Sequence, residues 1–319
     1  MTGPTSSGDS LVVTDLRVEF SGFVAVGGVS FDAHPGEVRF LIGPNGAGKT
    51  TCIDAITGLS QATGSARLGE QELLGRPVHK IVRLGVGRTF QTASVFNELS
   101  VLQNLDIAAG RHRHWASLLR TRRGVDPSIV QALEETGLTD ELATPAGILS
   151  HGQKQWLEIA MLLVQDARVL LLDEPVAGMS HDERTATGEL LQRIAAKRIV
   201  LVVEHDMDFM RRFATRVTVL HQGKVLSHGS VAEVQADPRV QEVYLGTAGA
   251  ATTAAMSVVP DVAAVALASS PAESAVRSAS SPAEPAVRLA SSPTEPTAQL
   301  ASEPDVTAGT QQQEEDSHA

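Results

Sequence analysis

Two stretches that lie far apart in the chain carry residue types suited to phosphate chemistry. The first, G-P-N-G-A-G-K-T-T at 43–51, matches the pattern G-x-x-x-x-G-K-[ST] in full. Its three glycines let backbone N–H groups turn inward around phosphates, Lys49 reaches the β and γ oxygens, and the Thr50 hydroxyl can bind Mg²⁺. The motif needs a buried strand before it and a helix after it, and V-R-F-L-I and C-I-D-A-I-T are suited to those two places. The stretch predicts a site for nucleotide phosphates.

The second stretch, R-V-L-L-L-D-E-P at 168–175, places two acids at the end of an apolar run. Asp173 can hold Mg²⁺ through water, and Glu174 can polarise an attacking water as a general base. An acid pair at a strand end is, by itself, more often a turn or a helix cap. Together with the phosphate loop, it predicts hydrolysis of the bound nucleotide.

A third stretch, L-S-H-G-Q-K-Q-W at 149–156, has the pattern of a helix start. Ser150 and Gln153 are spaced for a capping box. The free N–H groups of such a helix start suit an anion, yet His151 stands at the first position after the cap. If the anion is bound by Ser150 and the N–H of Gly152, the side chain of His151 need not contact it, and a histidine is tolerated at this position. A protonated His151 would instead add positive charge there.

These residues need a scaffold, and residues 11–247 read as strands that alternate with helices. Several apolar runs are β-branched and nearly continuous, as in strands buried on both faces of a parallel sheet with nucleotide at the strand ends. Residues 72–147 are less regular and predict a mostly helical subdomain inserted between the second and third core strands. The expected strands are 11–18, 38–43, 168–173, 198–204 and 216–221, and the expected helices lie near 49–57, 77–84, 101–109, 128–137, 150–165 and 182–196.

Composition sets wider bounds. The 319 residues, of which 42% are hydrophobic, suffice for one large core or two. Cys52 is the only cysteine, which excludes an intramolecular disulfide and favours a reducing compartment. The sequence shows neither a secretory signal nor the roughly 18 apolar residues of a membrane span, so we expect a soluble chain, and any membrane role would have to come through a partner. Of the net charge of −11, residues 250–319 contribute −7 and the rest −4, which neither requires nor excludes a class of partner.

The two ends of the chain differ from this body. We expect a flexible arm at 1–10 and a disordered tail at 248–319, because the tail repeats A-S-S-P every eleven residues and its prolines prevent a helix. The basic cluster R-H-R-H-W-A-S-L-L-R-T-R-R at 111–123 reads either as a solvated loop or as a surface near a partner or anionic lipid headgroups.

With these motifs in place, residues 11–247 resemble the nucleotide-binding subunit of an ATP-binding cassette transporter. The resemblance rests on six features in the family's order: an aromatic residue before the phosphate loop, the loop itself, G-R-T-F-Q, L-S-H-G-Q, the acid pair, and V-V-E-H-D. It implies an α/β fold of the P-loop NTPase type. We therefore expect a mostly parallel core sheet, an antiparallel β subdomain, and an inserted helical subdomain at about 90–165.

The family's roles pass to the matching residues of this sequence. Phe20 would stack on adenine, although a core aromatic is the alternative. Gln91 and His205 would join Glu174 in catalysis, although Gln91 could instead cap a turn. Mg²⁺ would be held by Thr50, Gln91 and Asp173. The phosphates of ATP would be bound by Gly43, Pro44, Asn45, Gly46, Ala47, Gly48, Lys49, Thr50 and Thr51, and the signature helix would be formed by Ser150, His151, Gly152 and Gln153.

In that family two subunits sandwich two ATP molecules, so the signature of one subunit serves the phosphate loop of the other. The resemblance implies a homodimer, or a heterodimer with a paralogous subunit, at the cytoplasmic face of the inner membrane. It also implies integral permease subunits as partners, an extracytoplasmic solute-binding protein as an indirect one, and no nucleic acid.

Several shorter motifs indicate which substrate the transporter would carry. G-V-G-R-T-F-Q resembles the subgroup that imports branched-chain amino acids, amides and urea, and L-S-H-G-Q-K-Q-W-L-E-I with E-P-V-A-G-M-S resembles its urea branch. We therefore expect urea, with branched-chain amino acids or short amides as the alternative. A soluble cassette protein of ribosomes or DNA would show two fused cassettes or a long coiled-coil insertion, and an exporter-type ATPase would co-purify with other membrane subunits. The loop V-A-G-M-S ends in Ser180 where the family commonly has Asp, and Ser180 with Glu183 predicts a capping box.

Overall fold

The computed structural model describes residues 10–90, 93–110 and 124–248. Four features of the sequence prediction therefore lie wholly or almost wholly outside the described residues. They are the arm at 1–10, Gln91, the basic cluster at 111–123, and the tail at 248–319.

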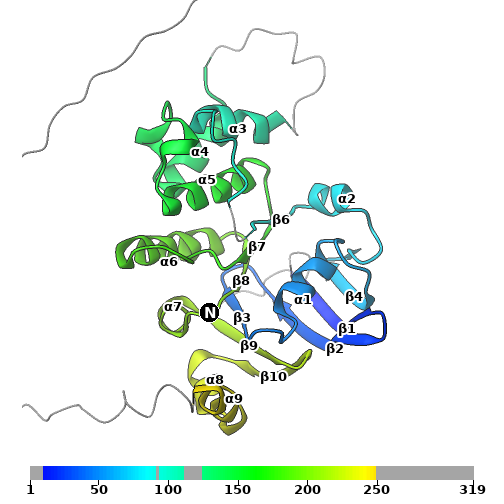
Figure 1. Cartoon of the computed structure of the whole chain (residues 1–319). Coiled ribbons are helices and arrows are strands. Elements are labelled where there is room, and N and C mark those ends of the chain that lie inside the picture. Colours follow the sequence, from blue (N-terminus) through cyan, green and yellow to red (C-terminus); the bar gives the residue numbers. More distant parts are fainter. Residues whose placement is uncertain (1–9, 91–92, 111–123, 249–319) are drawn as a thin grey trace, which may run out of the picture. The chain divides into compact units, whose positions relative to one another are not determined.

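The core is a six-stranded sheet in the order β10-β9-β3-β8-β7-β6, shown in Figure 1. Its strands run parallel except for the antiparallel pair β9 and β10. All residues of the three central strands are buried, as the continuous apolar runs predicted. The strands are β3 (Val38–Ile42), β6 (Val86–Arg88), β7 (Val169–Asp173), β8 (Ile199–Val203), β9 (Arg216–His221) and β10 (Lys224–Gly229).

Alternate residues of these strands belong to two different hydrophobic clusters, because side chains along a strand point to opposite faces. In β3, Phe40 and Ile42 belong to the cluster that also contains the core residues of α3, α4, α5 and α6. Leu41 belongs to the cluster formed with α1 and the second sheet. The core sheet thus separates the two clusters.

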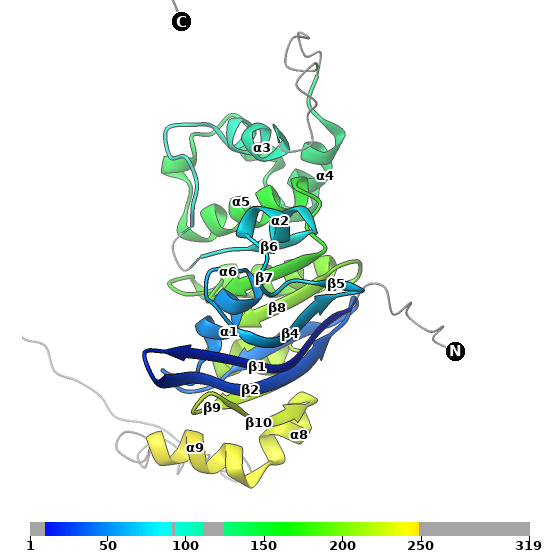
Figure 2. The same ribbon diagram turned by 90° about the vertical axis from the view of Figure 1, so that its right-hand side faces the viewer.

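The second sheet is antiparallel, in the order β2-β1-β4-β5. Figure 2 shows its strands in front of the core sheet. The turn between β1 and β2 is made by Ser21 and Gly22, both at positive φ (48° and 88°), which matches the right-handed twist of a hairpin. The expectation of a mostly parallel core sheet with an antiparallel β subdomain is confirmed. These strands are β1 (Leu11–Phe20), β2 (Phe23–Ala33), β4 (Thr63–Leu68) and β5 (Gln71–Glu72).

The helices begin and end close to the predicted positions. The two capping boxes read from the sequence are present, at Ser150 with Gln153 and at Ser180 with Glu183. Two short 3-10 turns, Thr139–Glu141 and Ala146–Ile148, lead into α5. The α-helices are α1 (Lys49–Ile56), α2 (Val78–Arg83), α3 (Val101–Ala109), α4 (Pro127–Thr136), α5 (His151–Val164), α6 (His181–Ala195), α7 (Met207–Phe213), α8 (Val231–Ala236) and α9 (Pro238–Ala248).

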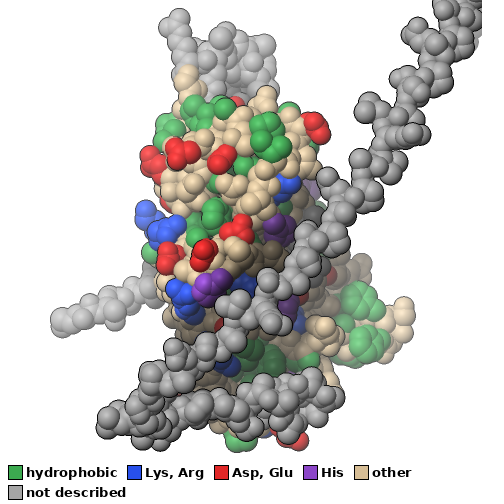
Figure 3. All heavy atoms as spheres, turned by 60° about the vertical axis from the view of Figure 1, so that its left-hand side comes forward, with side chains coloured by type: hydrophobic (Ala, Val, Ile, Leu, Met, Phe, Trp, Pro, Cys, Tyr) green, Lys and Arg blue, Asp and Glu red, His purple; other side chains and the backbone are tan. Residues whose placement is uncertain are grey.

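One core strand lies inside the stretch 72–147 that the sequence predicted to be mostly helical. The strand β6 pairs in parallel with β7 and has only three residues, V-G-R, which is too short to show a period of two. Charges of both signs are interspersed on the face of the described residues seen in Figure 3. Across the three described ranges, no helix has the length and apolar character required to cross a membrane.

Candidate functional site

The candidate catalytic residues follow three neighbouring parallel strands. Asp173 is the last residue of β7 and pairs with Val203, the last residue of β8, and Val203 of β8 also pairs with Leu41 of β3. The carboxyl ends of the three strands therefore meet at one edge of the sheet. The phosphate loop after β3, the acid pair after β7 and His205 after β8 are brought together at that edge.

The three glycines of the loop serve different purposes. A Cβ on Gly43 would lie 2.3 Å from the carbonyl oxygen of Leu220, and one on Gly48 would lie 2.7 Å from that of Ala25. Both glycines thus allow other backbone segments to approach the loop. Gly46 has φ +78°, and a Cβ there would meet nothing within 4 Å. At this position glycine supplies the left-handed conformation and leaves open space beside the loop.

Lys49, the first residue of α1, lies back across the loop. Its Nζ donates to the carbonyl oxygens of Gly43 at 2.8 Å and Pro44 at 3.2 Å, and the side chain is buried. Burial lowers the pKa of Lys49, while the charges of Glu174 and Asp173 act to raise it. The two acids and the lysine are therefore close enough to interact electrostatically, as a phosphate site with a hydrolytic acid pair requires. Of the next two residues, Thr50 is exposed and Thr51 half-buried.

Asp173 is held by an arginine that the sequence reasoning did not single out. Arg88, at the end of β6, contacts Asp173 Oδ2 with its Nη2 at 3.3 Å and also contacts Asp54 of α1. The side chains of Arg88 and Asp173 are 8% and 4% exposed. Burial raises the pKa of Asp173, and the guanidinium of Arg88 opposes that rise. Asp173 Oδ1 is buried and has no hydrogen-bond partner among the described residues.

Glu174 and His205 face each other across the edge of the sheet. The distance from His205 Nδ1 to Glu174 Oε1 is 3.4 Å, and the His205 side chain is largely exposed. Glu174 has φ +51°, a left-handed conformation that costs a non-glycine residue about 1–2 kcal/mol. Strain of this kind is common at functional sites, where surrounding contacts hold it.

Another buried acid, Glu204, supports this arrangement. It accepts hydrogen bonds from the backbone N–H groups of Val176 at 3.3 Å, His205 at 3.0 Å and Asp206 at 3.3 Å. Burial raises its pKa, and these N–H groups act against the rise. Glu204 thus joins the loop after the acid pair to the segment that carries His205. In the sequence Glu204 directly follows the apolar strand 199–203, and nothing in that local pattern indicates its contacts with Val176 and Asp206.

The aromatic residue at the end of β1 is half exposed. Phe20 lies across the hairpin turn from Phe23, and the two residues are 49% and 68% exposed. The core-aromatic alternative for Phe20 is therefore wrong. Sequence reasoning missed Phe23, whose exposure depends on the hairpin. Two residues beyond it, Ala25 reaches the phosphate loop at Gly48.

The signature helix α5 begins beside α6. The hydroxyl of Ser150 accepts from the N–H of Gln153 at 3.1 Å and donates to Glu183 Oε1 at 2.9 Å. A Cβ on Gly152 would lie 2.7 Å from Glu183 Oε1, so the same carboxylate also lies beside the backbone of Gly152. One turn further along, Trp156 Nε1 donates to Thr187 Oγ1 at 2.8 Å.

The imidazole of His151 lies over the loop that follows the acid pair. A Cβ on Gly178 would be 3.8 Å from His151 Cδ2, an ordinary packing distance. Ser150 bonds Glu183 of α6, the backbone of Gly152 lies beside the same carboxylate, and Figures 1 and 2 both place α5 with α3 and α4, away from α1. Within one chain the signature and the phosphate loop are therefore separate.

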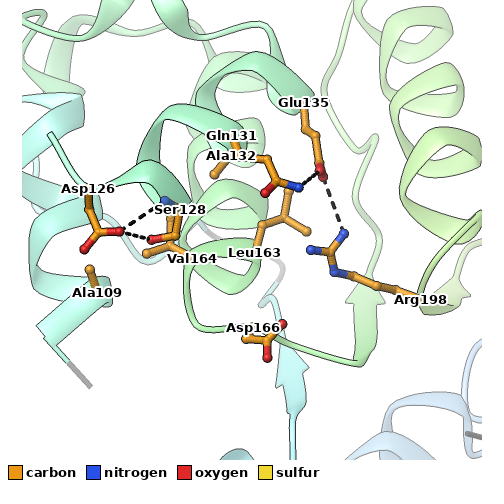
Figure 4. A pocket seen from close by; sticks show the side chains of 10 residues that line it. All are labelled: Ala109, Asp126, Ser128, Gln131, Ala132, Glu135, Leu163, Val164, Asp166 and Arg198. Atoms are coloured by element: carbon orange, nitrogen blue, oxygen red, sulfur yellow. Dashed lines mark hydrogen bonds and ion pairs between the residues drawn. The ribbon is translucent and has the colours of Figure 1, made fainter. Parts of the chain in front are cut away.

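A cavity lies elsewhere in the molecule. It measures about 400 Å³ and lies between α4, the end of α5 and the start of β8, as Figure 4 shows. At its wall, Gln131 Nε2 donates to Glu135 Oε1 at 2.7 Å along α4, and Arg198, just before β8, lies 3.5 Å from Glu135 Oε2. Its lining contains none of the predicted site residues.

Comparison with known proteins places the chain in a family. Residues 26–177 match the family model described as ABC transporter, and residues 224–250 match the one described as branched-chain amino acid ATP-binding cassette transporter. The chain is 38% identical over 250 residues to the high-affinity branched-chain amino acid transport ATP-binding protein BraF of Pseudomonas aeruginosa. It is 36% identical over 250 residues to LivG of Escherichia coli, and each match covers 75% of this chain and 98% of the relative.

Solved structures agree with the fold. The chain is similar to MJ1267, described as an ATP-binding cassette of an ABC transporter, with a TM-score of 0.65 and 28% identity over 74% of this chain and 98% of that one. It is also similar to cbiO1 from Clostridium perfringens, part of the ABC transporter complex cbiONQ, with a TM-score of 0.63 and 26% identity over 75% and 97% of the two chains. The chain therefore belongs to the ATP-binding subunits of ATP-binding cassette transporters, whose members are ATPases.

Proposed function

We propose that this subunit hydrolyses ATP to drive a membrane importer of branched-chain amino acids. The observation that carries the proposal is the match of residues 224–250 to the branched-chain amino acid transporter model, together with the BraF and LivG matches over nearly the full length of those relatives. The preference for urea, read from two short motifs, has no support in these comparisons, which favour the alternative drawn from the sequence. Urea remains the second candidate because those motifs stand in the sequence.

The proposed chemistry uses the groups at the carboxyl edge of the core sheet. Lys49 binds the β and γ oxygens of ATP, exchanging its bonds to the carbonyls of Gly43 and Pro44 for bonds to phosphate. Glu174 accepts a proton from the attacking water. His205, 3.4 Å from Glu174, donates a hydrogen bond to the terminal phosphate. Phe20 offers its exposed ring to adenine.

The residues at this edge fit a magnesium ion. Asp173 Oδ1 is buried without a hydrogen-bond partner among the described residues, and the exposed Thr50 hydroxyl stands at the start of α1. Thr50 and Asp173, the latter through water, would hold the ion, and Gln91 is the third proposed ligand. Mg²⁺ would neutralise charge that develops on the β and γ phosphates.

The active unit is proposed to be a dimer with composite sites. Because Ser150 and Gly152 are remote from the phosphate loop of their own chain, they would act on the γ-phosphate held by Lys49 of a second subunit. ATP would then close the dimer, and hydrolysis would allow it to open. This motion would act on permease subunits that receive cargo from a solute-binding protein outside the cell. The subunit would sit at the cytoplasmic face of the inner membrane.

Uptake of labelled leucine and labelled urea should be measured in a strain that lacks only this subunit. Restoring the intact chain is expected to restore leucine uptake, whereas the Lys49→Ala chain is not. Restored urea uptake without leucine uptake would refute the amino-acid assignment and favour the second candidate.

A further inference from the structure

The carboxylate of Glu183 forms hydrogen bonds at the starts of two helices, α5 and α6. Its Oε2 closes the capping box of α6 by accepting from the N–H and the hydroxyl of Ser180, both at 2.9 Å. Its Oε1 accepts from the hydroxyl of Ser150 at 2.9 Å and also lies beside the backbone of Gly152. One acid side chain therefore serves its own helix and the start of the signature helix.

The second contact places negative charge where the proposed mechanism places a phosphate. The hydroxyl of Ser150, which donates to Glu183, and the backbone of Gly152, which lies beside that carboxylate, are the groups proposed to bind the γ-phosphate of the partner's ATP. The fit is close, because a Cβ on Gly152 would lie 2.7 Å from Glu183 Oε1. Hydrogen bonds from Ser180, then from Ser150, lower the pKa of Glu183, so the group is an anion at neutral pH.

We propose that Glu183 is an internal anion that holds the signature-helix start in the separated subunit and must be displaced by the partner's γ-phosphate when the dimer closes. The inference rests on the proposed composite site. The Glu183 carboxylate and a γ-phosphate cannot both occupy this place, since the repulsion between the two anions disfavours the pair and the single hydroxyl proton of Ser150 bonds one acceptor well. Glu183 therefore acts as a positioning residue: it keeps Ser150 and Gly152 arranged for an anion and raises the ATP concentration needed for closure.

The chain contains a matched control for this residue. Helix α8 begins with the same capping box, in which Glu233 Oε2 accepts from the Ser230 N–H at 2.7 Å and its hydroxyl at 2.9 Å. The reciprocal N–H bond from the third residue to the serine hydroxyl is 3.3 Å in both boxes. Glu183→Gln and Glu233→Gln thus make the same change at two caps, of which only the first touches the signature helix.

Dimer formation should be measured by sedimentation of the full chain as ATP and Mg²⁺ are increased. A Glu174→Gln background is used because it is expected to bind ATP while hydrolysis is strongly slowed. In it, Glu183→Gln is expected to lower the ATP concentration for half-maximal dimerisation about two- to five-fold per site, the size of an exposed charged contact. Glu233→Gln is expected to leave it unchanged. A merely structural role would instead lower the thermal midpoint of both variants alike and shift neither ATP requirement.

An unchanged or higher ATP requirement in Glu183→Gln, or an equal shift in Glu233→Gln, would overturn the proposal. If Glu183→Gln folds poorly, Glu183→Asp provides the second test, because the acid keeps its charge at the N-terminus of α6, where it is favourable, while the loss of one methylene breaks the 2.9 Å contact with Ser150. It is expected to shift the ATP requirement in the same direction. If the Glu174→Gln parent itself stays monomeric with ATP, the composite site fails and this inference fails with it. A parent that dimerises beside variants that do not shift refutes the role of Glu183 alone.

Discussion

Replacing Arg88 by Met tests whether the buried ion pair at the acid pair holds the site together. Methionine keeps most of the volume of the arginine stem but leaves Asp173, 4% exposed, without its cation. Removing one partner of a buried pair costs about 3–5 kcal/mol. We expect the lower end of that range at about pH 8, since Asp54, the other carboxylate bound by Arg88, is 30% exposed and regains water.

The cost should depend on pH, with a sign that follows from the pKa of Asp173. Burial already raises this pKa, and loss of Arg88 raises it further. At pH values between the pKa of Asp173 in the unfolded chain and its higher pKa in the folded variant, the folded variant binds a proton that the unfolded chain does not. The free energy of unfolding of the variant therefore falls as pH rises through this range. The loss should therefore be smaller at about pH 5.5 than at about pH 8, by about 1.4 kcal/mol for each pH unit within that window.

Urea unfolding of the full chain at both pH values measures this difference. Arg211→Met is the control, because Arg211 pairs with Asp208 at 2.8 Å on the surface, and such pairs contribute about 0–1 kcal/mol. An equal loss at both pH values, or a loss in Arg211→Met as large as in Arg88→Met, would refute the reasoning.

Three further outcomes are expected. Glu174→Gln should retain ATP binding while phosphate release falls by a factor of about 10²–10⁴, as for loss of a general base, and unchanged hydrolysis would sink the assignment. Gly43→Ala should lower the thermal midpoint of unfolding much more than Gly46→Ala, because a Cβ on Gly43 would lie 2.3 Å from a carbonyl oxygen whereas one on Gly46 meets nothing within 4 Å. Gly46→Ala should still weaken ATP binding, because alanine disfavours the left-handed conformation of this residue. Equal thermal midpoints of the two variants would contradict this reasoning. His151→Gly should leave the pH profile of the ATPase unchanged, because the proposed phosphate contacts come from Ser150 and the Gly152 backbone, and a shifted acidic limb would mean that the imidazole adds charge.

Features that depend on neighbours in the sequence were predictable. The capping boxes at Ser150 and Ser180 each need only a residue three positions on, and α3 spans 101–109 as its periodicity predicted. The phosphate loop is equally local, since strand, glycines, lysine and helix follow one another without a break.

Features that depend on folding were not predictable in the same way. Arg88 meets Asp54 and Asp173, which are 34 and 85 positions away, and nothing in V-G-R reveals such a pairing. Glu183 was read as a cap for its own helix, which is correct, but its second contact is with a serine 33 positions earlier. The local sequence pattern predicts the hydrogen bonds of Glu183 within its own helix. Its bond to Ser150 depends on the packing of α5 against α6, which the pattern does not indicate.

The bond between Trp156 and Thr187 gives the molecule an internal optical reporter. The chain has two tryptophans, Trp115 and Trp156, so a Trp115→Phe chain would emit from the signature helix alone. Because the indole N–H of Trp156 is bound to α6, any separation of α5 from α6 would change the polarity around the ring and shift its fluorescence. The fluorescence of Trp156 would thus report whether α5 separates from α6 when ATP is added, without an attached dye.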